Sequence, residues 1–199
     1  MASETSGKLT RRDLYSLEEY AQRRAGFRQQ VMAHKKNRKV HIGPIATLYF
    51  EDRLTMLYQI QEMLRAERIF EPEGIQEELD AYNPLIPDGA NWKATFMIEV
   101  PDPEQRKQVL AQLIGIEDRV WVQVEGFERV YAIADEDLER ETEDKTSSVH
   151  FLRFELSPEM ISALKGGAAL SMGIDHPRYD HSVSPVPEEI RQALLADLA

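Results

Sequence analysis

The sequence contains no cysteine, and this absence excludes a large group of chemistries. A chain without thiols cannot form disulfides, bind zinc or an iron–sulfur cluster through thiolates, or use a cysteine nucleophile. Long apolar runs are also missing, so no segment is predicted to span a bilayer. Residues 1–8 are small and polar and lack the basic-then-apolar layout of a secretory signal. We therefore expect a cytoplasmic protein with no membrane contact.

A surplus of positive charge is missing too. The chain carries 24 Lys and Arg residues against 35 Asp and Glu residues, a net charge of -11 at pH 7. Nucleic-acid binding draws its affinity from clustered Lys and Arg, so no nucleic-acid partner is expected. The charge is uneven, because residues 1–40 hold ten Lys or Arg and four Asp or Glu, a net +6 that leaves -17 for the rest. This basic part is expected to pair with the acidic remainder or, as the alternative, with an anionic partner.

The composition indicates a globular protein. Hydrophobic residues make up 42% and charged residues 30% of the 199 positions, and no internal repeat is visible. This length fits one domain of ordinary size, or one domain with a helical extension.

Residues 43–70 are the stretch around which the chain is predicted to be organised. Apolar residues such as Phe50, Leu54 and Leu57 recur at three- and four-residue steps, which predicts a long helix that ends before Pro72. Polar side chains occupy most other directions around this helix. It is therefore expected either to face water broadly or to carry a polar network inside.

A second long helix is predicted over residues 10–37, opened by Thr10 as its N-cap. Arg24 and Arg28 lie one turn apart beside its apolar stripe, where they require carboxylate partners. An antiparallel pairing with the helix over 43–70 would supply those carboxylates.

The candidate site is a polar network between these two helices. It comprises Arg24, Arg28, His41, Glu51, Asp52, Arg53, Tyr58 and Glu62. Two interpretations stay open: a structural salt-bridge network between packed helices, or a ligand-binding or enzymatic site using the acid, base and anion-binding groups. The network contains no nucleophile with an evident partner.

From residue 92 onward the period changes to that of strands. The predicted order is a strand at 92–99, a helix at 103–113, a hairpin at 119–124 and 129–133, a strand at 149–156, a helix at 158–166 and a last strand at 168–174. The acidic stretch 135–145 is predicted to be a solvated helix or a mobile loop. The predicted fold class is α+β: two long N-terminal helices packed with a mixed or antiparallel sheet of about five strands in a split βαβ-like order, with flanking helices.

The predicted domain organisation has four parts. They are a disordered N-terminus at 1–9, a helical half at 10–91, an α/β half of the same domain at 92–181, and a linker with a terminal helix at 182–199.

Sequence motifs for known chemistries are scarce. The chain lacks a phosphate-binding glycine loop, a GxSxG elbow, HExxH and the Glu-x-x-His pairs of di-iron bundles. The weak candidates for a metal are His176, Asp180 and His181, with His41 as a further histidine for a metal or haem. We expect no bound cofactor.

Three segments carry a resemblance to a known family: LYFEDRLTMLYQIQEMLR at 48–65, GIQEELDAYNPLIP at 74–87 and HFLRFEL at 150–156. Through them the chain resembles an uncharacterised bacterial family catalogued as domain of unknown function 3501. The resemblance extends from about residue 9 to residue 181 and brings no catalytic residue with it.

The resemblance implies a redox or peroxide-stress setting, because genes of that family lie beside those of a rubrerythrin-like protein and an iron–sulfur protein of the heterodisulfide-reductase type. A chain without cysteine or a di-iron motif would then be an accessory or interaction protein that forms a homodimer and partners a redox protein. The alternatives are a small-molecule-binding protein or enzyme and a metal or haem binder.

Overall fold

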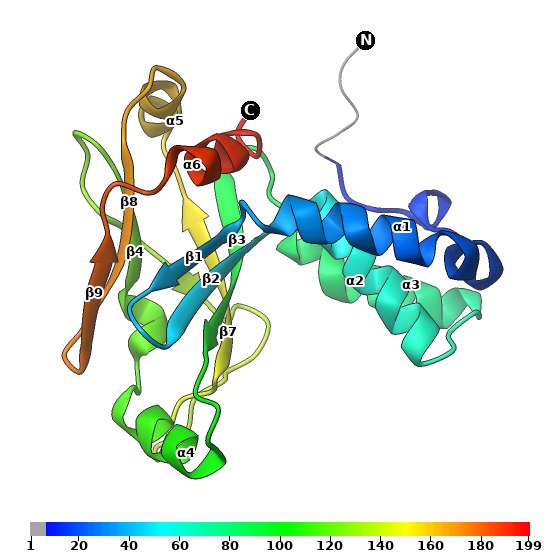
Figure 1. The fold of residues 1–199 in the computed structure, drawn as a ribbon, viewed down its shortest axis with the longest axis horizontal. Coiled ribbons are helices and arrows are strands. Elements are labelled where there is room, and N and C mark those ends of the chain that lie inside the picture. The colour runs from blue at the N-terminus through cyan, green and yellow to red at the C-terminus, as the bar shows by residue number, and fades with distance from the viewer. Residues whose placement is uncertain (1–6) are drawn as a thin grey trace.

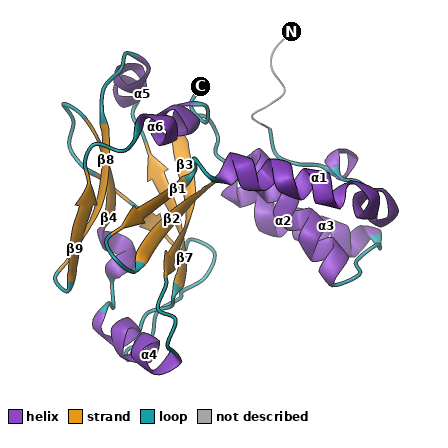
Figure 2. Ribbon diagram, in the orientation of Figure 1, coloured by secondary structure: helices purple, strands orange, loops and turns teal. Residues whose placement is uncertain are grey.

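Residues 7–199, which the computed structural model describes, form a layered β region and a helical arm that projects from its side (Figures 1 and 2). The α-helices are α1 (Leu17–Lys35), α2 (Arg53–Ala66), α3 (Pro72–Tyr82), α4 (Pro103–Gln112), α5 (Pro158–Lys165) and α6 (Glu188–Leu195). Short 3-10 helices are η2 (Arg11–Asp13), η3 (Asn83–Leu85) and η4 (Ile116–Arg119).

The strands form two sheets, and every neighbouring pair is antiparallel. The first sheet has the order β1 (Lys39–Ile42), β2 (Ala46–Glu51), β3 (Asn91–Ile98), β7 (Val149–Glu155), β6 (Ile133–Ala134). The second has the order β5 (Val130–Tyr131), β4 (Val120–Val124), β8 (Leu170–His176), β9 (Tyr179–Val183). The predicted α+β class is confirmed, and one antiparallel sheet has five strands, but the single split βαβ-like sheet is wrong. The strands predicted at 119–124, 129–133 and 168–174 contribute β4, β5 and β8 to a second sheet that the sequence pattern did not predict.

One hydrophobic core lies between the two sheets. Phe50 of β2 and Phe96 of β3 belong to the same cluster of buried side chains as Val122 of β4 and Met172 of β8. Such strands place alternate residues on the inner face, so the core is built from both sheets at once.

The helix predicted over 43–70 is wrong in its first third. Residues 46–51 form β2, which pairs with β1 on one side and β3 on the other, and α2 begins only at Arg53. Asp52 is the N-cap of α2, because its side chain accepts a hydrogen bond from the backbone N–H of Thr55 at 3.0 Å. Of the two long helices that were predicted, α1 has 19 residues but α2 has only 14.

The arm has a small hydrophobic core of its own, made of Leu9, Met56, Ile60, Leu64, Leu79 and Ile86. Leu9 is 2% exposed, and its N–H donates to Asn83 Oδ1 at 2.7 Å. The predicted disordered N-terminus is therefore wrong at Leu9, while residues 1–6 of that prediction lie outside the described residues. The chain enters the sheet between α1 and α2, so the β1–β2 hairpin interrupts the arm.

The C-terminal helix α6 packs on the β region (Figure 1). The indole N–H of Trp92 donates to the carbonyl of Leu194 at 2.9 Å, and Leu194 is fully buried. The predicted linker that leads to it is instead part of the folded region, because β9 extends to Val183 and the N–H of Val186 donates to Leu170 O at 2.7 Å.

The helices of the described residues were compared with the requirements for a membrane span. Among residues 7–199, none of the helices combines the length and the apolar character needed to cross a bilayer.

Candidate functional site on the helical arm

Glu62 is the centre of a polar network between α1 and α2. Its carboxylate accepts hydrogen bonds from Arg24 Nη2 at 2.8 Å and Nε at 2.9 Å, from Tyr20 OH at 2.8 Å and from Tyr58 OH at 3.4 Å. Tyr20 and Arg24 lie one turn apart on α1, and Tyr58 and Glu62 lie one turn apart on α2. The two helices therefore present matching pairs of side chains to each other.

The electrostatics of this network fix its protonation state. The hydrogen bond from Arg24 is the main cause that lowers the pKa of Glu62 to about 2, against the desolvation that comes with partial burial. Burial, together with the hydrogen bond to Glu62, raises the pKa of Tyr20. Glu62 is therefore an ionised acceptor throughout the physiological range, which suits a structural ion pair better than a general base.

Replacing Glu62 with glutamine should lower the free energy of unfolding at neutral pH by about 1–2 kcal/mol, because a charge-assisted bond is lost at a partly exposed site. The pKa of Glu62 lies lower in the folded chain, at about 2, than its ordinary value of 4.5, so the unfolded chain binds more protons between these values. The stabilisation is complete above the ordinary pKa and disappears as the pH falls toward the folded one. Urea unfolding of both proteins across this range measures it, and a difference that stays constant on acidification would contradict the assignment.

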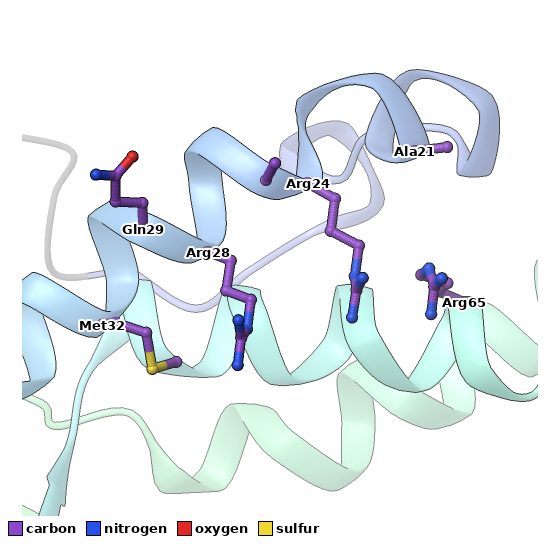
Figure 3. A pocket seen from close by; sticks show the side chains of 7 residues that line it. Ala21, Arg24, Arg28, Gln29, Met32 and Arg65 are labelled. Atoms are coloured by element: carbon purple, nitrogen blue, oxygen red, sulfur yellow. The ribbon is translucent and has the colours of Figure 1, made fainter.

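A groove of about 690 Å³ runs along α1 next to this network (Figure 3). Its lining residues are Ala21, Arg24, Ala25, Arg28, Gln29, Met32 and Arg65. In Figure 3 the side chains of Arg24, Arg28 and Arg65 lie side by side. Met32, which closes one end, is 41% exposed. The lining of the groove therefore combines three guanidinium groups with a few small or flexible apolar side chains.

Positive charge in this groove is only partly neutralised. Glu62 pairs with Arg24, whereas the guanidinium groups of Arg28 and Arg65 have no hydrogen bond or ion pair with any residue from 7 to 199. Two guanidinium groups are thus free to bind an anion, on a chain whose net charge is -11. The prediction that the basic residues 1–40 pair within the fold holds for Arg24 but not for Arg28, and Arg65 lies outside that part of the sequence.

The structure does not bring the eight residues of the predicted network into one site. Arg24, Tyr58 and Glu62 meet between α1 and α2, and Arg28 lies beside them in the groove. The other four are dispersed.

Each dispersed residue has a separate partner. Glu51 accepts a hydrogen bond from Thr95 Oγ1 at 3.0 Å within the sheet, and Arg53 Nη2 lies 2.9 Å from Asp13 Oδ1. His41 is exposed on β1, with Nδ1 2.9 Å from the hydroxyl of Thr47. Asp52 points into a second cleft, at the base of the arm. The predicted network failed here because residues 46–51 form a strand rather than the first turns of a helix.

That second cleft, the junction cleft, has a volume of about 400 Å³ and lies where α1, the start of α2 and α6 meet. It contains the carboxylate of Asp52, 2.6 Å from His34 Nε2, and the guanidinium of Arg38, which is 2% exposed. Arg38 donates to three backbone carbonyls, at Phe50, Glu51 and Ala193, over 3.0, 3.3 and 3.2 Å, and binds the carboxylate of Asp197.

Burial raises the pKa of Asp197 to about 6, although Arg38 opposes the shift. For Asp52, burial acts in the same direction, but the hydrogen bond from His34 and the charge of Arg38 outweigh it and lower its pKa. The contribution of His34, Arg38 and Asp197 could not be predicted from local sequence spacing, because Asp197 lies 159 residues from Arg38 along the chain.

The predicted metal candidates are not assembled into a ligand set within the described residues. His176 Nε2 donates to Ile114 O at 2.8 Å, and its Nδ1 accepts from the N–H of Arg178 at 3.1 Å. The ring of His181 lies against that of Tyr179, with centroids 4.5 Å apart. Asp180 is exposed on the same β8–β9 hairpin without joining either histidine.

Fold and site together define an α+β protein with two antiparallel sheets and a helical arm that carries an arginine-lined groove. The chain belongs to the DUF3501 family, described as "Protein of unknown function", whose family model matches residues 8–198. It is 52% identical to a protein of unknown function from Burkholderia pseudomallei K96243 whose crystal structure has a TM-score of 0.92, over 97% of this chain and 100% of that chain. None of the curated proteins matches the chain. The resemblance at the three sequence segments is thus confirmed.

Proposed function

We propose that this chain is a cytoplasmic interaction protein, without catalytic activity of its own, whose helical arm binds an acidic surface of a partner protein. The observation that carries the proposal is the pair of unneutralised guanidinium groups of Arg28 and Arg65 in one groove. Free cations gathered on an otherwise acidic protein favour a specific anionic partner, because like charge elsewhere on the surface repels non-cognate orientations.

The chemistry of the groove supports a protein partner over a small anion. Guanidinium groups bind carboxylates through two parallel N–H donors, and arginine is enriched where protein surfaces meet. Ala21 and Ala25 add small apolar side chains to the lining, and Met32 adds an adaptable apolar side chain. A groove that is open along one side of a helix suits a helix or loop better than an enclosed metabolite.

The family resemblance points to a redox or peroxide-stress system, in which a rubrerythrin-like protein or an iron–sulfur protein is the expected partner. A chain without cysteine cannot be the thiol or cluster carrier of such a system. A second copy of this chain is the alternative partner for the groove, because residues 41–199 carry a net charge of -17 and could supply the acidic surface. The proposal therefore includes a homodimer.

The test compares the native chain with the double variant Arg28→Glu, Arg65→Glu against a purified rubrerythrin-like protein and a purified heterodisulfide-reductase-type protein. We expect the variant to bind at least about tenfold more weakly, and the native affinity to fall steeply with added salt. The matched control is Arg12→Glu, Lys107→Glu, which makes the same charge change at exposed residues outside the groove.

Equal binding of the groove variant and the native chain, or equal loss in the control, would refute the proposal. Sedimentation of the native chain and of the groove variant measures whether the chain forms a homodimer in solution. Dissociation of a dimer by the two groove substitutions would assign the groove to self-association instead of to a redox partner.

A second candidate function is the binding of a small polar molecule in the junction cleft. It is favoured by one observation: His34, Asp52 and Asp197 converge there, and the raised pKa of Asp197 is of the kind found at sites that bind or transfer protons. Native mass spectrometry of protein purified without additives tests it. A reproducible extra mass that is absent from a His34→Ala variant would support this function, and a clean apo mass would count against it.

A further inference from the structure

A further cavity, the sheet pocket, has a volume of about 460 Å³ and lies where the arm meets the first sheet. The register places Tyr49 of β2 opposite Thr95 of β3, and Thr95 opposite Phe151 of β7, so these three side chains share one face of the sheet. Alternate residues of the same strands fill the core between the sheets, so this face is turned away from that core. Met56 of α2 and Tyr82 of α3 belong to the part of the lining that the arm supplies.

Glu51 places a buried carboxylate in the lining of the sheet pocket. The residue is 7% exposed, and its Oε1 accepts a hydrogen bond from Thr95 Oγ1 at 3.0 Å. Among residues 7–199, no donor bonds to Oε2 and no basic side chain forms an ion pair with Glu51. A carboxylate has about four acceptor positions, and burying its charge without a cation is costly. A ligand that brings a positively charged N–H donor to Oε2 would reduce that cost.

Two lysines lie near Glu51, and neither neutralises it. Lys93 is opposite Glu51 in the β2–β3 register, but it lines a neighbouring cavity together with Glu136. Lys35 does line the sheet pocket, and its Nζ lies 5.9 Å from the centroid of the Tyr58 ring rather than within ion-pair distance of Glu51. The negative charge of Glu51 is therefore available to a cation that enters the pocket.

The rest of the lining favours an organic cation over a metal ion. It contains the rings of Tyr49, Tyr82 and Phe151 and the thioethers of Met56 and Met97. Aromatic rings attract ammonium groups, and methionine adapts to apolar ligands of different shapes. A divalent metal ion requires several oxygen or nitrogen ligands, which one carboxylate does not supply. The volume is in the range of pockets that bind small molecules.

We propose that the sheet pocket binds a small organic molecule with an amino group and an apolar body, and that its ammonium group donates to Glu51 Oε2. The apolar body would contact the aromatic rings and the two methionines. Thr95 is a positioning residue, because its hydroxyl holds Oε1 of the same carboxylate. The sheet pocket shares no lining residue with the arginine groove or the junction cleft, so this site is independent of both proposed functions.

The experiment titrates the full chain, labelled with nitrogen-15, with phenethylamine and with 2-phenylethanol, in which a hydroxyl replaces the ammonium group. Both titrations are followed by the amide resonances of Thr95 and Phe151. We expect saturable shifts, with phenethylamine bound at least about tenfold more tightly, because a charge-assisted hydrogen bond is stronger than a neutral one. In Glu51→Gln this preference should fall below about twofold, because glutamine keeps the shape and the acceptor for Thr95 but loses the charge.

The matched control is Glu67→Gln, the same change at an exposed residue of the arm outside the pocket, which should keep the native preference for the amine. Met97→Trp is a second variant if Glu51→Gln does not fold. Its larger side chain should fill the pocket and abolish the binding of both probes, with folding verified by circular dichroism.

Four results would overturn the proposal. The first is the absence of saturable shifts with phenethylamine up to about 10 mM, a weak affinity even for a ligand of this size. The second is equal affinity of the native chain for the amine and the alcohol. The third is a native preference in folded Glu51→Gln, or an equal loss of preference in Glu67→Gln. The fourth is undiminished binding of phenethylamine to folded Met97→Trp.

Discussion

Replacing Arg38 with methionine should lower the free energy of unfolding by about 3–5 kcal/mol, the cost typical of breaking a buried ion pair on one side. The side chain of Arg38 is 2% exposed and joins three parts of the molecule. It binds carbonyls of the β1–β2 hairpin region, the carbonyl of Ala193 in α6 and the carboxylate of Asp197. Methionine would fill much of the volume but leave these acceptors buried without a donor. Urea unfolding followed by tryptophan fluorescence measures the loss.

Two comparisons identify the cause of this loss. Adding Asp197→Asn to Arg38→Met should recover part of the stability, because it removes the buried unpaired charge. Lys36→Met, the same kind of change at an exposed neighbour, should alter stability by less than about 0.5 kcal/mol. A loss in Arg38→Met no larger than in Lys36→Met would show that the junction does not depend on the guanidinium.

Replacing Gly173 with alanine should destabilise the second sheet by about 3 kcal/mol, at the upper end of overpacking in a filled core. A Cβ at Gly173 in β8 would lie 2.4 Å from Cζ2 of Trp121 and 2.8 Å from the carbonyl oxygen of His181. Both neighbours are themselves held in strands, β4 and β9, that pair with β8. The sheet must therefore open locally to admit one methyl group, which thermal and urea unfolding would detect.

The matched control for this prediction is Gly26→Ala. A Cβ at Gly26 in α1 would meet nothing within 4 Å, so the same chemical change should stabilise the chain by about 0.5–1 kcal/mol through helix propensity. If Gly173→Ala were as stable as the native chain, the close approach of Trp121 to β8 would not persist in solution.

Elements with a clear local period were predictable from the sequence. The alternation after residue 91 predicted β3, and Asp102 and Ser157 before prolines predicted the starts of α4 and α5. Residues 46–51 were misassigned because their apolar side chains satisfy a helical spacing as well as a strand that is buried on both faces. Residues 46–51 form a strand because they pair with β3 and with the edge strand β1, and a local sequence pattern contains no information about that pairing.

The same distinction applies to the sites. The ion pair of Arg24 with Glu62 followed from one-turn spacings on two neighbouring helices. The junction cleft did not, because it joins α1 to a C-terminal helix predicted to follow a linker. Glu51 was predicted in the helical network, but the pocket that it lines combines β2, β3 and β7 with the arm. Sequence spacing thus identifies partners on adjacent turns and misses those that only tertiary packing brings together.

Because the β1–β2 hairpin lies between α1 and α2 in the sequence, the order in which the elements emerge during translation affects when the arm can form. α1 leaves the ribosome before the hairpin, and β2 can pair with β1 at once but gains its second neighbour only when β3, at residues 91–98, has emerged. The hairpin that connects α1 to α2 therefore lacks the rest of its sheet during the first half of translation, and the arm cannot yet be fixed against the β region. A chain that ends after α2 also lacks Leu79 and Ile86, which complete the hydrophobic core of the arm, so we expect such a truncated arm to expose apolar surface rather than to fold early.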